Sequence, residues 1–188
     1  MREYESVSVI LPERYIDAEI DNKTNQSVEH MITYYHQNFI KVFEPAGLAP
    51  VFFGVPGAGK THAAAALSKI LVSMGVEVGW ADTVETFNKL LDYRDFRSNS
   101  YFRLKNDLQD RRVLVFDDFG QLRDFDRIRE LFFQIVNYRY AWKKPTIFTA
   151  NFVVDSQEDW ETKVGGCFNP SLARRIQAMS DGLVVSLT

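Results

Sequence analysis

The sequence predicts an α/β fold of three layers, with a parallel sheet between two layers of helices. Three observations lead to this prediction. Apolar strands alternate with amphipathic helices, a glycine-rich turn joins one strand to the next helix, and two acids end a later apolar strand. Strands and helices in alternation form right-handed crossovers, which make the strands parallel and cover both faces of the sheet.

The apolar spacing gives the expected elements in order. One amphipathic helix precedes the core; Ser27 can cap it, and it ends near Pro45 and Gly47. Core strands are expected at 50–53, 76–80, 113–116 and 146–149, and core helices at 61–74, 83–91, 101–108 and 128–140. The 188 residues can bury one substantial core, and no change in composition marks a boundary. We therefore expect a single domain over residues 1–188, with an approach segment at 1–50 and the core at 51–188.

Composition narrows the classes of function. The formal net charge of −3 argues against a generally basic, DNA-coating protein, although a local basic stripe remains possible. There is no basic-then-apolar leader and no apolar run long enough to cross a bilayer, so we expect a cytoplasmic protein without a membrane partner. His30 and His36 lie six residues apart, off one helical face, and with His62 they give no metal-ligand spacing.

The glycine-rich turn carries the strongest motif. Residues 54–61 read GVPGAGKT and match G-x-x-x-x-G-K-[ST], directly after a predicted strand and at the start of a predicted helix. Glycines let backbone N–H groups turn toward phosphate oxygens, and the helix adds its positive end. We expect Lys60 to reach the β and γ phosphates and the Thr61 hydroxyl to ligate Mg²⁺. The motif predicts a P-loop NTPase that binds ATP or ADP with Mg²⁺; a glycine turn with an incidental lysine is the alternative. Its expected nucleotide contacts are Gly54, Pro56, Gly57, Ala58, Gly59, Lys60 and Thr61.

Polar residues follow two of the predicted strands. Asp117 and Asp118 end the strand at 113–116, at the edge where parallel sheets place their ligands. Asp117 is expected to hold Mg²⁺ and Asp118 to polarise the attacking water, although Asp118 could instead serve a cap or turn. Asn151 follows the strand at 146–149, and its amide could orient that water or contact the γ-phosphate. Strand-end asparagines are more often plain turn residues.

Two further patterns are more ambiguous. Arg174 and Arg175 are adjacent, and an exposed guanidinium there could act as an arginine finger on a neighbouring subunit's γ-phosphate. Two solvated arginines on an ordinary helix would look the same. The stretch 93–105 interleaves aromatic and basic residues, which suits single-stranded nucleic acid because bases stack on rings. An amphipathic helix gives the same pattern.

With these motifs in order, the chain resembles the AAA+ ATPases of the DnaC, DnaI and IstB type, which are helicase loaders and transposition helpers. The resemblance covers nearly the whole chain. Besides the P-loop it rests on residues 11–15, His62 directly after the P-loop threonine, residues 116–120 and residues 137–147.

The resemblance implies roles for individual residues. Lys60, Thr61 and His62 belong to the nucleotide site, Asp117 and Asp118 form the Walker B pair, Asn151 is sensor 1, and Arg175 is the arginine finger with Arg174 in reserve. It also implies an ATPase that forms a nucleotide-dependent homo-oligomer on single-stranded DNA and acts on a hexameric replicative helicase.

Two departures qualify this expectation. Loaders of this type usually carry an N-terminal domain that grips the helicase, whereas about ten residues precede Pro12 here, which leaves the mode of helicase contact open. Most AAA+ proteins continue into a helical lid with a second sensor arginine, whereas this sequence ends at Thr188, soon after the arginine pair. Without a lid, hydrolysis should be slow and stimulated by assembly or DNA.

Three other functions fit parts of the pattern. An IstB-like transposition helper would need a transposase and double-stranded DNA. A P-loop small-molecule kinase usually has an arginine-rich lid, and none is found between the acid strand and Asn151. A binding module could hold ATP without turning it over.

Overall fold

The computed structural model describes residues 11–21, 24–92, 99–124 and 126–187. Its sheet has five strands in the order β2-β3-β4-β1-β5, and each neighbouring pair is parallel. The strands are β1 (Val51–Gly54), β2 (Val78–Asp82), β3 (Val113–Asp117), β4 (Thr146–Ala150) and β5 (Val184–Leu187). The predicted parallel sheet is confirmed. β2 begins two residues later than expected, and β5 was not predicted.

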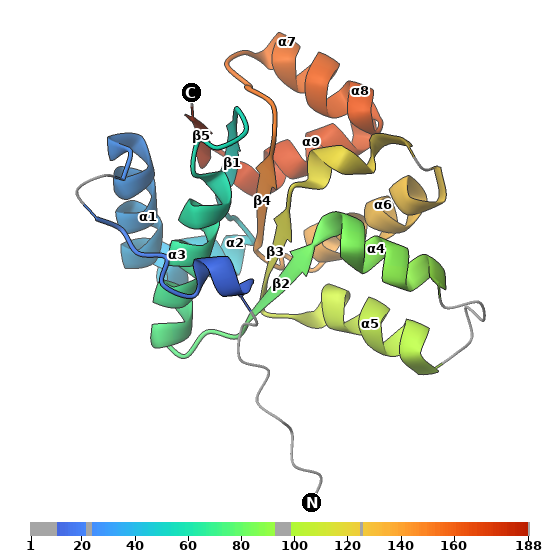
Figure 1. Cartoon of the computed structure of the whole chain (residues 1–188), viewed down its shortest axis with the longest axis horizontal. Helices are drawn as coiled ribbons and strands as arrows, with labels where there is room; N and C mark the ends of the chain where they lie inside the picture. The colour runs from blue at the N-terminus through green and yellow to red at the C-terminus, as the bar shows by residue number, and fades with distance from the viewer. Residues whose placement is uncertain (1–10, 22–23, 93–98, 125, 188) are drawn as a thin grey trace, which may run out of the picture.

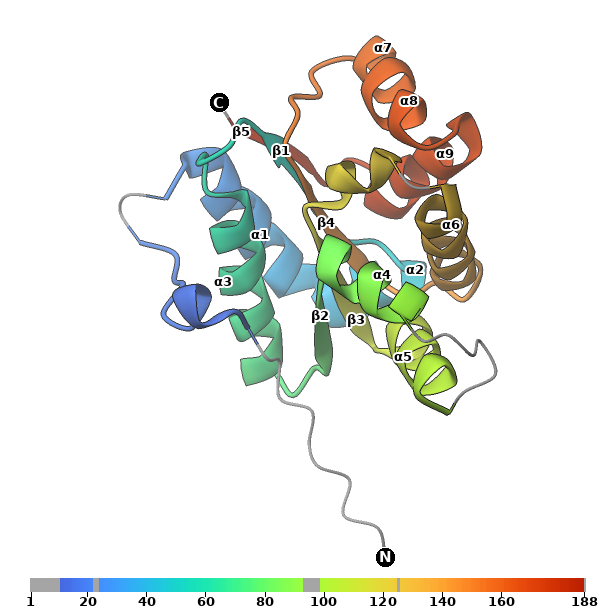
Figure 2. The same ribbon diagram turned by 45° about the vertical axis from the view of Figure 1, so that its right-hand side comes forward.

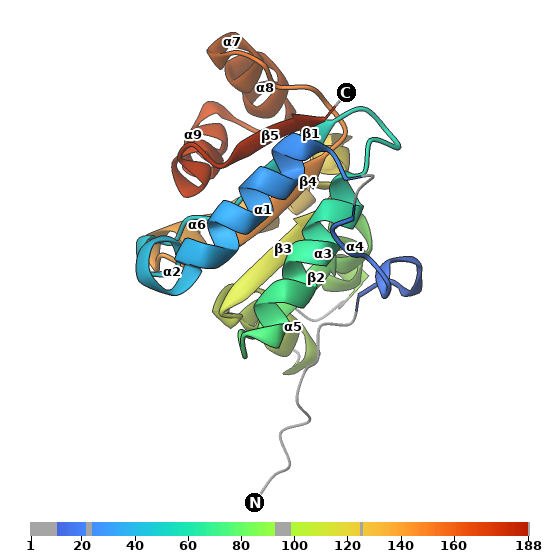
Figure 3. The ribbon, with the colours of Figure 1, turned by 90° about the vertical axis from the view of Figure 1, so that its left-hand side faces the viewer.

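Helices cover both faces of the sheet, as Figures 1 and 2 show. One face carries α1 (Gln26–Asn38) and α3 (Lys60–Ser73), which lie side by side across it in Figure 3. The other face carries α4 (Thr83–Asp92), α5 (Asn99–Asp110), α6 (Asp126–Ala141) and α9 (Pro170–Ser180). The three-layer α/β class is therefore confirmed.

Each strand contributes side chains to two apolar layers. On β1, Phe52 packs with α1 and α3, whereas Val51 and Phe53 pack with the opposite helices. The same alternation on β3 places Val115 on the first side and Phe116 on the second. Successive side chains of a strand point to opposite faces, so a strand covered on both sides is apolar along its whole length. This burial is why the strand motifs could be recognised as short apolar runs.

The helical segment before the core is longer than one regular helix. It continues from α1 through η2 (Phe39–Phe43) and α2 (Glu44–Ala46) and ends at Gly47, whose φ is 75°. A Cβ at Gly47 would lie 2.6 Å from Lys143 Cα, so the chain can close against the end of α6 only with glycine here. The expected N-cap was wrong: Asn25 caps α1, because its side chain accepts from the Ser27 N–H at 2.9 Å.

The chain between β4 and β5 forms helices that the apolar spacing did not predict. A continuous helical stretch contains α7 (Gln157–Asp159), η4 (Trp160–Val164) and α8 (Gly165–Cys167), and α9 follows it. Two short 3₁₀ turns complete the fold, η1 (Glu13–Tyr15) and η3 (Phe119–Asp124). Within the ranges given above, no helix is both long and apolar enough to span a bilayer.

Candidate nucleotide-binding site

The glycine-rich turn lies between β1 and α3 and has the backbone that its sequence requires. Gly57 and Gly59 have φ values of 84° and 93°, in the left-handed region. A Cβ at either would meet no atom within 4 Å, so the space beside them is open. At Gly54 the requirement is steric, because a Cβ would lie 2.1 Å from the Leu187 carbonyl oxygen. The turn thus combines an open inner side with a tight attachment to β5.

A buried cation lies at the start of α3. Lys60 is 6% exposed, and its Nζ donates to the Val55 carbonyl at 2.7 Å. Burial lowers the pKa of Lys60, while the nearby Asp118 and Asp117 act in the opposite direction. Together with the positive N-terminal end of α3, this ammonium makes the turn a site for an anion.

Asp117 receives two hydroxyl groups at the end of β3. Its Oδ1 accepts from Thr61 Oγ1 at 3.0 Å and from Thr149 Oγ1 at 2.6 Å. Burial raises the pKa of Asp117, and the hydrogen bonds from Thr149 and Thr61 oppose that shift. Mg²⁺ in phosphate-binding sites takes one or two protein oxygens and completes its shell with phosphate and water oxygens. The Thr61 hydroxyl and the Asp117 carboxylate fit this donor set.

Asp118 is held in an unusual conformation next to Asp117. Its φ is 54°, and its Oδ2 accepts from Asn151 Nδ2 at 2.7 Å and from Gln121 Nε2. Its Oδ1 is buried and has no hydrogen-bond partner within the described residues. Burial raises the pKa of Asp118, whereas the Gln121 hydrogen bond and Lys60 lower it. A left-handed backbone at a residue other than glycine costs about 1–3 kcal/mol, and such strain clusters at functional sites.

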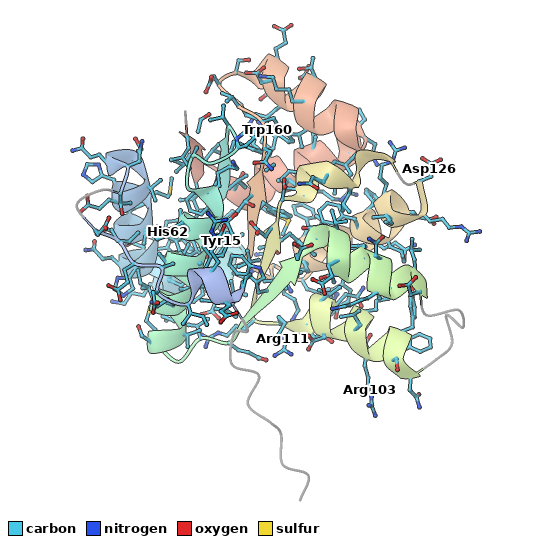
Figure 4. The ribbon with its side chains drawn as sticks, in the orientation of Figure 1. Tyr15, His62, Arg103, Arg111, Asp126 and Trp160 are labelled. Carbon is cyan, nitrogen blue, oxygen red and sulfur yellow. The ribbon has the colours of Figure 1, made fainter. Side chains whose placement is uncertain are left out.

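The N-terminal segment closes over the same edge of the sheet. A cavity of about 300 Å³ beside the turn is lined by Lys60, Thr61 and Asn151 together with Arg14 and Tyr15 of η1. Figure 4 shows Tyr15 and His62 near each other where η1 meets α3. The segment is fastened there by His62, whose Nε2 lies 2.9 Å from the Glu19 carbonyl oxygen.

A second cavity lies on the other side of the turn. It measures about 280 Å³, and its lining includes Asn25 and Val28 of the approach segment, Ala58 and His62 of the turn and α3, and Leu187 at the end of β5. The two cavities share Gly59 and His62, so they form adjoining spaces along one loop.

The structure therefore brings together most of the residues that the sequence singled out. Lys60, Thr61, Asp117, Asp118 and Asn151 converge at the carboxyl edge of the sheet, because β3 and β4 are neighbours and β1 leads into the turn. Of the other residues in the motif, Ala58 is partly buried against the apolar layer on the α3 side, and Val55 and Pro56 are exposed.

The arginine pair lies elsewhere. Arg175 donates from Nε to Asn137 Oδ1 on α6 at 2.7 Å. Within the described residues, its hydrogen bonds and ring contacts are made with α6 and α9, away from the turn. Arg174 is exposed and donates to the Pro170 carbonyl at 3.2 Å. A role on a nucleotide bound to the same chain has no support in these contacts.

The aromatic and basic stretch is only partly described, because residues 93–98 lie outside the described ranges. On α5, Tyr101 is buried and belongs to the core, as the amphipathic-helix alternative expected. Phe102 is 48% exposed, and Arg103 points away from the body of the molecule in Figure 4. This helix therefore presents one ring and one cation to solvent.

Sequence reasoning missed several polar residues around the acid pair. Thr149 bonds Asp117 and also accepts the Asp118 N–H at 2.8 Å. Thr83 donates to the Asp117 carbonyl at 2.5 Å, and Asp82 lies opposite Asp117 in the β2–β3 register. Thr149 was detectable, since it lies two residues before Asn151 and a strand repeats its face every two residues.

The fold and this site define a P-loop nucleotide-binding protein with the Walker-type arrangement of lysine, threonine and acids. Residues 42–179 match the family model described as IstB-like ATP binding protein. The chain belongs to this family, and it is an AAA+ protein of the DnaC, DnaI and IstB type.

Individual relatives agree with this assignment. The replicative helicase loader DnaC of Escherichia coli (strain K12) is 28% identical over 115 residues, which cover 61% of this chain and 47% of the relative. The chain thus spans about half the length of the curated relatives it matches. A crystal structure of the DnaC helicase loader superposes with a TM-score of 0.81 at 27% identity, covering 94% of this chain and 100% of that one.

More distant structures share the fold. The crystal structure of DnaI has a TM-score of 0.74 at 20% identity, covering 96% of each chain. The replication initiator DnaA bound to AMPPCP and single-stranded DNA has a TM-score of 0.71 at 18% identity and covers 95% of this chain and 51% of that one.

Proposed function

We propose that this chain is a helicase-loader-type ATPase of the cytoplasm, which binds ATP with Mg²⁺, assembles with itself on single-stranded DNA and acts on a hexameric replicative helicase. The observation that carries the proposal is the convergence of Lys60, Thr61, Asp117, Asp118 and Asn151 in a chain that superposes along 94% of its length on a DnaC helicase loader.

The two cavities suggest where each part of the nucleotide binds. The polar space beside Lys60, Thr61 and Asn151 suits the terminal phosphates. The other space has an apolar wall of Val28, Ala58 and Leu187, which suits the base, and polar groups from Asp21, Thr24 and Asn25, which suit the sugar. An apolar wall with few polar groups is the usual setting for a flat ring, whereas phosphates need N–H groups and cations. His62 borders both spaces, which supports its place in the nucleotide site.

Hydrolysis follows from the residues around the acid pair. Thr61 and Asp117 would hold Mg²⁺, which when bound would supply positive charge to the β and γ phosphates. Within the described residues, Asp118 Oδ1 has no hydrogen-bond partner, so it can accept a proton or hydrogen bond from the attacking water. Asn151 donates to the other oxygen and so fixes the carboxylate in one orientation. We infer that Arg175 acts on the γ-phosphate of a neighbouring copy, since its contacts keep it on α6 and α9.

Assembly size and phosphate release test this proposal together. The protein is sized with Mg²⁺ and a non-hydrolysable ATP analogue, with and without a single-stranded oligonucleotide, and phosphate release from ATP is measured under the same conditions. We expect nucleotide-dependent assembly and hydrolysis stimulated by the oligonucleotide. A chain that stays monomeric, releases no free phosphate, and converts ATP to ADP only when a small-molecule acceptor is present and becomes phosphorylated would be a kinase. Binding of ATP without any turnover would leave a binding module.

A transposition-helper function is the second candidate, and the family description as IstB-like favours it. Such a protein would prefer double-stranded DNA. Binding to fluorescent single-stranded and double-stranded oligonucleotides of one sequence separates the two, and a clear preference for the duplex would replace the loader proposal.

A further inference from the structure

Arg175 lies on a surface that holds its guanidinium in one orientation. On α6, Phe133, Asn137 and Tyr140 are spaced by four and three residues, so they form one stripe along the helix. We call these three residues the α6 stripe. The Arg175 Cζ lies 5.0 Å from the centre of the Phe133 ring and 6.0 Å from that of Tyr140. Both distances are within the range of a cation–π contact.

Hydrogen bonds fix the rotation of the guanidinium on this stripe. Nε donates to Asn137 Oδ1 at 2.7 Å, and Nη1 donates to the Ser171 carbonyl at 3.0 Å and to the Ser171 hydroxyl. Within the described residues, Nη2 has no hydrogen-bond partner, and Arg175 is partly exposed. Two of the three guanidinium nitrogens, Nε and Nη1, are therefore bound, and the N–H groups of Nη2 are available.

A second arginine on α6 shows what a purely structural guanidinium looks like. Arg139 is fully buried, and each of its three nitrogens donates to an oxygen of the protein. It also has no exposed edge. Arg175 differs because its partners restrict its orientation without using all of its donors.

We propose that Asn137 is a positioning residue for Arg175: it holds Nε so that the N–H groups of Nη2 are presented to the terminal phosphate of a nucleotide on a neighbouring copy. This inference rests on the proposed function, in which Arg175 acts between copies. A free arginine side chain loses rotamer entropy when it is fixed. Because Asn137 fixes part of that freedom in advance, losing its amide should slow the assisted reaction by roughly tenfold.

A mixing experiment separates positioning from folding. Lys60→Ala lacks its own nucleotide site but offers an intact Arg175, whereas Arg175→Ala offers an intact site without the arginine. Each variant alone should hydrolyse ATP poorly, and their mixture should recover activity in mixed assemblies. Asn137→Ala is then added to one partner at a time.

The inference predicts an asymmetric result. Asn137→Ala in the Lys60→Ala partner should reduce recovery about tenfold, while Asn137→Ala in the Arg175→Ala partner should leave recovery unchanged. Asn137→Asp keeps an acceptor for Nε and should restore most of the recovery. Gln134→Ala removes an exposed amide from the same helix and is the matched control, with recovery unchanged in either partner.

Two outcomes contradict the inference in different ways. Asn137 has no positioning role if Asn137→Ala leaves the recovery of ATPase activity unchanged. The same conclusion follows if the substitution reduces recovery equally in either partner. Sizing with the ATP analogue checks that the two variants co-assemble. If mixed assemblies form and the parent mixture still fails to recover, the use of Arg175 between copies is wrong and the role of Asn137 falls with it.

Discussion

Buried charges lie at opposite edges of the sheet, and their surroundings differ. At the carboxyl edge, burial raises the pKa of both Asp117 and Asp118, and one oxygen of Asp118 has no partner in the described part of the chain. At the amino edge, Arg139 donates to Thr146 Oγ1 and to backbone carbonyls at the end of α5 and before β4. Burial lowers the pKa of Arg139 to about 9, which still leaves it charged at neutral pH. Arg139, whose three guanidinium nitrogens all donate to protein oxygens, stabilises the fold. In contrast, Asp118 Oδ1 can accept a hydrogen bond from a ligand or water.

The largest effect expected from this comparison is loss of nucleotide binding at the carboxyl edge. Lys60→Ala removes the ammonium proposed to neutralise the terminal phosphates, so ATP affinity should fall by roughly 100-fold or more. Lys69→Ala is the matched control on α3, because its ion pair with Glu19 spans 3.8 Å at the surface and should contribute little. Titration with a fluorescent ATP analogue measures both, and unchanged affinity in Lys60→Ala would remove the proposed site.

Loss of hydrolysis without loss of binding should follow from Asp118→Asn. The amide cannot accept a proton from water, so phosphate release should fall by roughly 100-fold or more while nucleotide affinity stays within a few-fold. The control Asp126→Asn neutralises an acid that is highly exposed at the start of α6 and should release phosphate at the parent rate. If Asp118→Asn releases phosphate at the parent rate, Asp118 is a turn or cap residue, which is the alternative that the sequence left open.

A large loss of stability, rather than of chemistry, is expected at the amino edge. Arg139→Met leaves the carbonyls of Leu108, Arg111 and Pro145 without their donor, and removing one partner of such a buried network costs about 3–5 kcal/mol. Tm should fall by roughly 10 °C for a chain of this size. Arg129→Ala, which removes a surface ion pair from the same helix, should change Tm by less than about 2 °C. Similar Tm values for Arg139→Met and Arg129→Ala would contradict the structural role of Arg139.

The smallest predicted effect is a gain of thermal stability, in the variant Asp117→Asn. Because the folded-state pKa of Asp117 is raised, the folded protein binds the proton more tightly than the unfolded chain, and stability falls as pH rises through that raised pKa. Asp117→Asn keeps an oxygen for Thr61 and Thr149 without the buried charge. At neutral pH, without Mg²⁺ or nucleotide, its Tm should rise by about 2 °C. The gain should disappear below the ordinary carboxylate pKa, and a variant less stable than the parent at neutral pH would show that this carboxylate stabilises the fold.

Much of this arrangement follows from local sequence patterns. The turn at 54–61 and the acids after β3 were predictable because glycine, lysine and carboxylate each have a specific chemical use at a strand end. The strands of the core were predictable because burial on both faces makes them apolar throughout. Their first and last residues were less certain, since those depend on pairing with neighbouring strands.

Other features depend on tertiary contacts and left no local signal. The four residues of β5 alternate between buried and half-buried, and they form a strand because they pair with β1. Asp82 belongs to the site because β2 lies beside β3, and that neighbour relation is not encoded at Asp82 itself. The contact of Asn137 with Arg175 joins residues 38 positions apart on different helices, so neither residue alone indicates it.

The close approach of Gly54 to Leu187 has a mechanical consequence. The Val55 N–H donates to the Leu187 carbonyl at 3.2 Å and the Gly54 N–H to the Phe152 carbonyl at 3.0 Å, so main chain meets main chain without a side chain between them. Because no side chain separates the two segments, a displacement of Leu187 at the end of β5 should move the first residues of the turn at 54–61 with it.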